Sequence, residues 1–140
     1  MNPDLRFIFD NNVLISAFLF KGSTPRRAFD LALSLGTIIH SEETLNELWE
    51  VLVRPKFDRF LSIEDRVKLL HAFEQISEHC SVSTVVTLCR DPKDDKFLSL
   101  ALSASAESIT SGDKDLLVLS DVFSVPIYTP AQFIEVNSKI

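Results

Sequence analysis

A chain of 140 residues and 15.8 kDa has the size of one domain with a sizeable core, so we expect a single domain over residues 1–140. Its net charge of −6 at pH 7 argues against a protein that coats nucleic acid through bulk positive charge. A nuclease remains compatible with this charge, because part of the negative charge can belong to a cation-binding site.

The cysteines and the apolar segments indicate the cellular compartment of the protein. Cys80 and Cys89 are too few and too oddly spaced for a disulfide framework or a zinc site. No apolar stretch approaches the roughly 20 residues that cross a bilayer. The N-terminus lacks the basic region and apolar core of a signal peptide. We therefore expect a cytoplasmic protein that contacts no membrane.

Strand and helix patterns alternate along the chain. Leu5–Phe9 is apolar on both faces apart from one arginine, which is typical of a central parallel strand. Ser23 or Thr24 can cap the following helix, and Pro25 suits its first turn. Gly36 follows the last turn of that helix.

The middle of the chain continues this alternation. Thr37–His40 reads as a second strand, and Ser41 can cap a helix that Pro55 ends. Ser62 opens a longer helix that is predicted to reach about His79. Its apolar stripe predicts five core positions: Ile63, Val67, Leu70, Phe73 and Ile76.

The last third supplies the remaining strands. Val82–Leu88 is β-branched and predicts a short strand, Asp94–Ala106 a helix, and Ser108–Ser111 and Pro126–Thr129 two more strands. The total is four or five strands interleaved with about six helices. Such alternation predicts an α/β fold, a three-layer α/β/α sandwich with a central parallel sheet.

Four acidic residues stand where a strand pattern ends or a helix pattern opens: Asp10, Glu47, Asp95 and Asp113. Because the carboxyl ends of parallel strands meet at one crevice, we expect these side chains to converge there. Glu47 lies one and a half turns beyond Ser41, where a long side chain can reach back to the crevice. Taken alone, Asp10 is better explained as a helix cap or turn former and Glu47 as a side chain that faces water, so the prediction depends on the four acids together.

The segment Asp91-Pro92-Lys93-Asp94-Asp95 offers three acids. Asp91 precedes a proline and is expected to be extended. Asp94 is a natural N-cap, which places Asp95 in the first helical turn with a carboxylate that can point outward. We therefore predict that Asp95, rather than Asp94, joins the crevice.

Gathered carboxylates repel one another unless a cation neutralises them. Oxygen ligands without a His or Cys cluster favour Mg²⁺ or Mn²⁺, and such ions point to phosphate chemistry. The chain has no phosphate-binding glycine loop, GxSxG elbow or plausible Cys–His pair, so nucleophilic catalysis by the protein has little support.

On these residues the chain resembles the PIN domain, a ribonuclease family that includes toxins of bacterial toxin–antitoxin pairs. The resemblance extends from Phe7 to about Phe133. It rests on four segments: Phe9–Ala17, Ser41–Leu48, Asp94–Ala101 and Thr110–Leu116. Asp95 and Asp113 keep the 18-residue interval of the family. Arg54–Phe57 and Cys89–Pro92 are similar to the toxin subgroup.

The resemblance implies that the four acids bind metal and catalyse. Asp10 and Asp95 would be direct ligands, with Asp113 close behind, while Glu47 would bind a second ion or hold metal-bound water. Asn12 would support the first acid, Ser111 would precede the last acid, and Asp115 would be an additional acid. Asn11 departs from the family, in which threonine is common at this position.

The function implied by the resemblance is a Mg²⁺- or Mn²⁺-dependent endoribonuclease that cleaves single-stranded RNA, pairs with an antitoxin protein and forms a homodimer. Leu69 lies off the main stripe of its helix and either widens a dimer surface or sinks the helix deeper into its own core. One alternative is a PIN-fold module that binds RNA or protein without cutting. Another is a receiver-type signalling domain, although Pro126–Thr129 lacks the lysine expected there.

Overall fold

Five parallel strands form the centre of the protein in the order β3-β2-β1-β4-β5. The structure is a computed structural model that describes residues 2 and 4–138. The strands are β1 (Arg6–Phe9), β2 (Thr37–His40), β3 (Glu78–His79), β4 (Ser108–Thr110) and β5 (Ile127–Tyr128). The predicted parallel sheet is confirmed. Receiver-type domains have the order 2-1-3-4-5, so this topology excludes that alternative.

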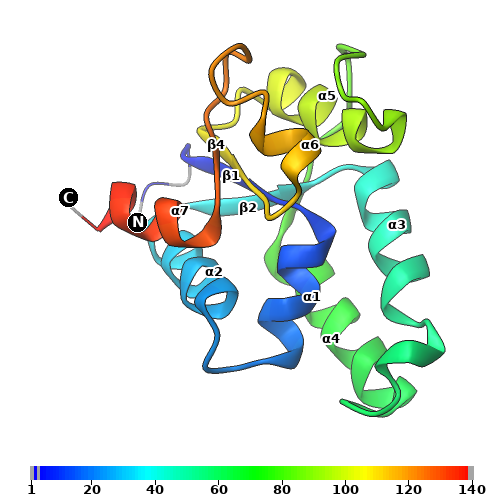
Figure 1. The fold of residues 1–140 in the computed structure, drawn as a ribbon. Coiled ribbons are helices and arrows are strands. Elements are labelled where there is room, and N and C mark those ends of the chain that lie inside the picture. Colours follow the sequence, from blue (N-terminus) through cyan, green and yellow to red (C-terminus); the bar gives the residue numbers. More distant parts are fainter. Residues whose placement is uncertain (1, 3, 139–140) are drawn as a thin grey trace.

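Helices cover both faces of the sheet, as the three-layer prediction requires (Figure 1). The helices are α1 (Asn11–Leu19), α2 (Thr24–Leu35), α3 (Glu42–Leu52), α4 (Ile63–Ile76), α5 (Asp95–Ala104), α6 (Lys114–Leu117) and α7 (Pro130–Asn137). Two single 3₁₀ turns complete the set, η1 (Pro55–Phe57) and η2 (Pro92–Asp94). Within the described residues, no helix is long and apolar enough to span a membrane.

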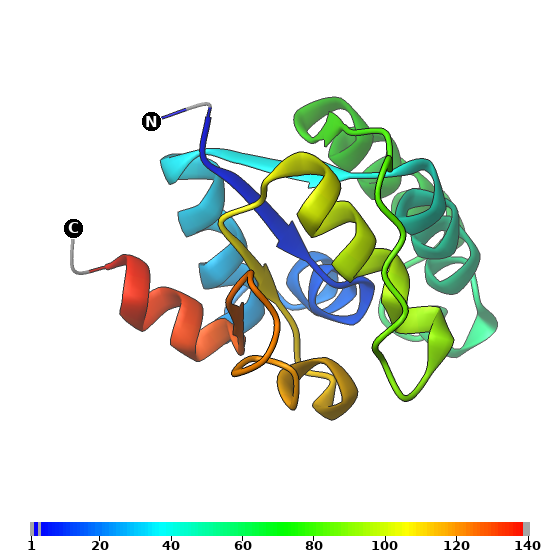
Figure 2. The same cartoon turned by 90° about the horizontal axis from the view of Figure 1, so that it is seen from above.

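Each face of the sheet has its own hydrophobic core. Phe7, Phe9 and Ile38 point into the first core, which is closed by α1, α2, α3, α4 and α7. Ile8, Ile39 and Ile109 point into the second core under α5 and α6. Figure 2 shows α5 lying across the sheet on that side. Because successive side chains of β1 point to opposite faces of the sheet, this strand contributes residues to both cores.

The long helix α4 is shorter than predicted and differs in what it buries. It ends at Ile76 because Glu78–His79 instead pair with β2. Leu70 and Phe73 are buried as predicted, but Ile63 and Ile76 are 46% and 51% exposed. The fully buried residue near the start of this helix is Arg66.

The predicted strand over Val82–Leu88 is wrong, because this segment pairs with side chains rather than with a strand. The backbone N–H groups of Ser83 and Thr84 donate to Ser103 Oγ, each at 3.0 Å. The N–H of Val86 donates to Ser99 Oγ at 2.9 Å. The segment therefore runs over α5 as an extended strap.

Candidate active site

Asp10 lies at the carboxyl end of β1, the central strand, and is only 4% exposed. Its Oδ1 accepts the backbone N–H of Val13 at 2.9 Å and so caps α1. Its Oδ2 accepts the hydroxyl of Ser111, which follows the neighbouring strand β4. Ser111 Oγ in turn accepts the N–H of Asp113 at 2.9 Å. Ser111 therefore links the first and the last acid of the predicted set.

Three further carboxylates gather at one place, and one of them, Asp113, acts on Asp10 through its charge. Asp94, Asp113 and Asp115 each offer an oxygen, and these oxygens lie within 4.8 Å of one another. Oxygen ligands of an octahedral Mg²⁺ ion lie up to about 4.2 Å apart, so small side-chain movements would let all three bind one ion. The donor set is entirely carboxylate oxygen, which fits the hard cation predicted from the sequence.

Asp95 does not join this cluster. Its Oδ1 accepts the backbone N–H groups of Leu88 at 3.0 Å and Cys89 at 2.7 Å, which fixes the strap to the start of α5. Burial would raise the pKa of Asp95, but these two hydrogen bonds outweigh it and lower the pKa below its usual value. The structure therefore brings Asp94, rather than the predicted Asp95, to the other acids.

The predicted cap at Asp94 is wrong for a local reason. Pro92 opens the turn η2, which Asp91 caps by accepting the N–H of Lys93 at 3.0 Å. Helical geometry thus begins two residues before Asp94, whose own backbone is already helical and whose side chain makes no capping hydrogen bond. The Asp94 carboxylate is left available for the crevice.

Burial and mutual repulsion shift the pKa of two acids. Burial raises the pKa of Asp10 to about 6, the charge of Asp113 adds to this, and the hydrogen bond from Ser111 opposes it. Burial, followed by the charge of Asp113, raises the pKa of Asp94 to about 7. Both shifts identify a place where negative charge lacks a counterion. Burial and the nearby Asp95 raise the pKa of the Cys89 thiol to about 12, so it is no nucleophile.

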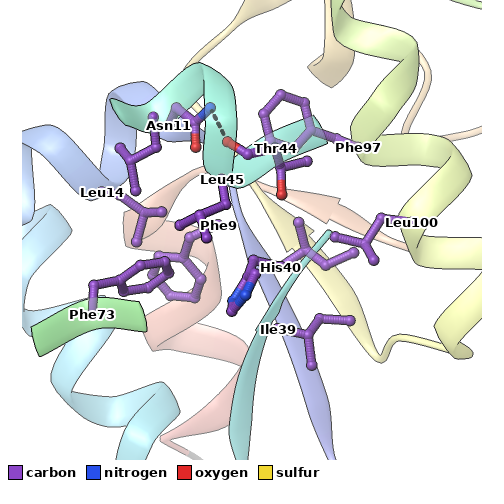
Figure 3. A pocket seen from close by; sticks show the side chains of 12 residues that line it. Phe9, Asn11, Leu14, Ile39, His40, Thr44, Leu45, Phe73, Phe97 and Leu100 are labelled. Carbon is purple, nitrogen blue, oxygen red and sulfur yellow. Dashed lines mark hydrogen bonds between the residues drawn. The ribbon is translucent and has the colours of Figure 1, made fainter. Parts of the chain in front are cut away.

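Glu47 reaches the crevice from α3, as predicted, but lies outside the group of three carboxylates. Its Oε1 accepts Asn11 Nδ2 at 2.7 Å, and its Oε2 accepts Lys96 Nζ at 2.6 Å. Asn11 also donates to the carbonyl of Thr44 at 3.1 Å, and Figure 3 shows its amide pointing from α1 to α3. Glu47 is therefore held by one neutral and one charged partner.

Asn11, Asn12 and Lys96 differ from what the sequence suggested. Asn11 was predicted only as a departure from the family, but its side chain is 6% exposed and anchors Glu47. Asn12 is exposed at the cleft. In the described part of the chain its side chain makes no hydrogen bond to Asp10, the acid that it was expected to support. Lys96 carries no local signal in the sequence, because its partner Glu47 is 49 residues away.

Four of these acids line one open cleft of about 680 Å³: Asp10, Glu47, Asp94 and Asp113. Asp95 and Asp115 do not contribute to its walls. Cations also line it: Arg54, Lys56, Lys93 and Lys96. A carboxylate cluster with basic walls therefore lies at the carboxyl end of the parallel sheet, which is where open α/β folds bind their ligands.

Comparison with known proteins agrees with this fold. Residues 6–115 match the sequence profile of the PIN domain, and the chain belongs to that family. It is 32% identical over 145 residues to the uncharacterized protein MJ1680 of Methanocaldococcus jannaschii, a match that covers 96% of this chain and 93% of the relative.

Two solved structures share the fold at low sequence identity. A chain of VapBC2 from Rickettsia felis, bound to a DNA fragment from their promoter, has a TM-score of 0.63 and 13% identity. That match covers 89% of this chain and 98% of the other. PAE2754 from Pyrobaculum aerophilum has a TM-score of 0.60 and 12% identity, covering 96% and 91%.

The raised pKa of Asp10 predicts a pH-dependent effect on stability. Since the folded pKa of about 6 lies above the ordinary 3.8, the stabilising contribution is complete below pH 3.8 and is lost as pH rises through 6. Asp10→Asn should therefore stabilise the metal-free protein progressively from pH 4.5 to 7.5, by up to roughly 3 kcal/mol. Urea unfolding in EDTA at both pH values measures this.

The exposed Asp121 provides the matched control as Asp121→Asn. An advantage of Asp10→Asn that is the same at both pH values would contradict a buried, titrating carboxylate at position 10.

Proposed function

We propose that residues 1–140 form a single PIN domain that acts as a Mg²⁺- or Mn²⁺-dependent endoribonuclease, the toxin of a toxin–antitoxin pair. The observation that carries the proposal is the meeting of Asp94 and Asp113, which line one open cleft with the buried Asp10, and of Asp115, which has a carboxylate oxygen within 4.8 Å of theirs. When bound there, a divalent cation would supply the charge that activates water and neutralises a phosphodiester.

The residues of the cleft would have different roles in this reaction. Asp94 and Asp113 would bind the cation directly, with Asp10 and Asp115 completing the set, and Ser111 would orient Asp10 by its hydrogen bond. Asp94 replaces Asp95 in this assignment. Glu47 would face the reacting water or phosphate.

Basic residues on the same cleft support a nucleic-acid substrate. Arg54 and Lys56 are exposed on its wall and, within the described residues, form no ion pair. Unpaired cations beside an acidic site attract the phosphates that the acids alone would repel. The openness of the cleft suits a single strand, whose backbone can pass along α3 toward η1.

The proposed partners are an antitoxin protein and a second copy of the chain. The fold shared with VapBC2, solved on promoter DNA, supports the first, and the toxin-like segments around Arg54 and Cys89 agree with it. Leu69 does not support a dimer, because it packs against the first core of its own chain. The homodimer therefore stands on family resemblance, and light scattering at micromolar concentration tests it.

Cleavage of an end-labelled single-stranded RNA tests the proposed activity. The purified protein should cut it in Mg²⁺ or Mn²⁺ and stop in EDTA, while an Asp94→Asn sample prepared in parallel should stay inactive. Equal cleavage in EDTA, or by the variant, would reveal a contaminating nuclease or a different chemistry. A well-folded protein that binds the RNA without cutting it under all conditions would favour the non-catalytic binding module.

A further inference from the structure

Lys96 is buried beside acids, although lysine side chains usually extend into water. Its side chain is 8% exposed, and its Nζ contacts Glu47 Oε2 at 2.6 Å. The same ammonium donates to the backbone carbonyl of Lys93 in η2. Lys96 lies in the first turn of α5, whereas Glu47 lies in the middle of α3. The pair therefore joins elements from the two sides of the sheet.

Both carboxylate oxygens of Glu47 are held by hydrogen bonds. While Lys96 binds one oxygen, Asn11 Nδ2 binds the other at 2.7 Å, and Asn11 is itself anchored on the carbonyl of Thr44. This charge-assisted and bidentate arrangement leaves the carboxylate little freedom to turn. In this position Glu47 lies outside the cluster of Asp94, Asp113 and Asp115.

We infer that Lys96 is a positioning residue of the cleft: it neutralises Glu47 and holds that carboxylate away from the bound cation. The cation then rests on the aspartates alone, and Glu47 stays free of it to face water or phosphate. This inference rests on the proposed function, since it assigns roles within the same cleft. A simple ion pair between α3 and α5, with no effect on the cation, is the competing explanation.

The two explanations predict opposite effects when the ammonium is removed. Lys96→Met would make the cleft more negative by one charge and release Glu47 toward the cation, so cation binding should tighten by about tenfold. Turnover should nevertheless fall by about a hundredfold, because Glu47 would leave its working position. An ion pair that served stability alone would leave cation affinity unchanged or weaken it.

Calorimetric titration with Mn²⁺ at fixed ionic strength, with no RNA present, separates these outcomes. Lys96→Met should bind Mn²⁺ about tenfold more tightly than the unmodified protein, and Lys96→Arg should remain within about threefold of it. Lys93→Met removes an exposed cation from the same cleft and controls for bulk charge. The double variant Lys96→Met/Glu47→Gln should return most of the way to the original affinity, because the released carboxylate is gone.

The possible failures are distinct. An unmodified protein that binds Mn²⁺, together with a folded Lys96→Met variant of equal or weaker affinity, would overturn the role of Lys96 and leave the proposed function intact. An equal gain in Lys93→Met would also overturn it, since charge alone would then explain the effect. An unmodified protein that binds no Mn²⁺ would overturn both proposals.

Discussion

Asp94→Asn is expected to remove metal-dependent cleavage, whereas Asp95→Asn is expected to keep it. Asp94 offers its carboxylate to Asp113 and Asp115, and an amide supplies only a neutral oxygen to a hard cation. Loss of a residue that merely orients a ligand costs about 10–100-fold, so loss of a ligand should reduce activity more than about a hundredfold. Mn²⁺ affinity should fall in parallel.

Asp95→Asn is the matched control, because it changes the adjacent residue in the same way. Its remaining carbonyl oxygen can still accept from Leu88 and Cys89, so the strap should stay in place. Rate measurements on both variants at saturating Mg²⁺, with circular dichroism to verify folding, decide the matter. Inactivity of Asp95→Asn with retained activity of Asp94→Asn would restore the original sequence-based choice.

The largest loss of stability is expected for Arg66→Met. The guanidinium is fully buried and donates to four backbone carbonyls, those of Leu52 at 2.9 Å, Arg54 at 3.0 Å, Leu61 at 3.1 Å and Ser62 at 3.4 Å. It also pairs with the largely exposed carboxylate of Asp58. Methionine fills the space but leaves the carbonyls at the end of α3 without a donor, which should cost about 3–5 kcal/mol.

Urea unfolding followed by the fluorescence of Trp49, the sole tryptophan, measures this loss. Arg27→Met is the control, because Arg27 is exposed and forms no ion pair in the described part of the chain. It should change the free energy of unfolding by less than about 0.5 kcal/mol. A loss below about 1 kcal/mol for Arg66→Met would mean that water replaces the guanidinium.

Local chemistry explains why most of the fold could be predicted. Ser23, Ser41 and Ser62 each accept a backbone N–H at the start of their helices, as the sequence suggested. Such caps involve residues three apart, and the apolar run of β1 needs no distant information either. Ordering these elements into a parallel sheet then follows from general rules of connection.

The predictions that failed concern features that depend on contacts between distant residues or on the exact start of a helix. The single turn at Pro92 moves the helix start back, so that Asp94 meets Asp113 and Asp115 while Asp95 binds the backbone of Leu88 and Cys89. Lys96 has its carboxylate partner 49 residues away, which no local pattern reveals. Arg66 did carry a signal, because it lies three residues after Ile63 and four before Leu70, on the face predicted to be apolar.

The central position of β1 gives the protein a further property. Asp10 follows β1 and caps α1, and Glu47 lies on α3, both helices of the first core, while Asp94 and Lys96 lie on η2 and α5 on the side of the second core. The groups proposed for catalysis thus meet where the two layers adjoin, and a displacement of one layer relative to the other would pull them apart. A substitution in the core of either layer would consequently lower activity by misaligning the groups of the cleft, even where each of those groups is unchanged.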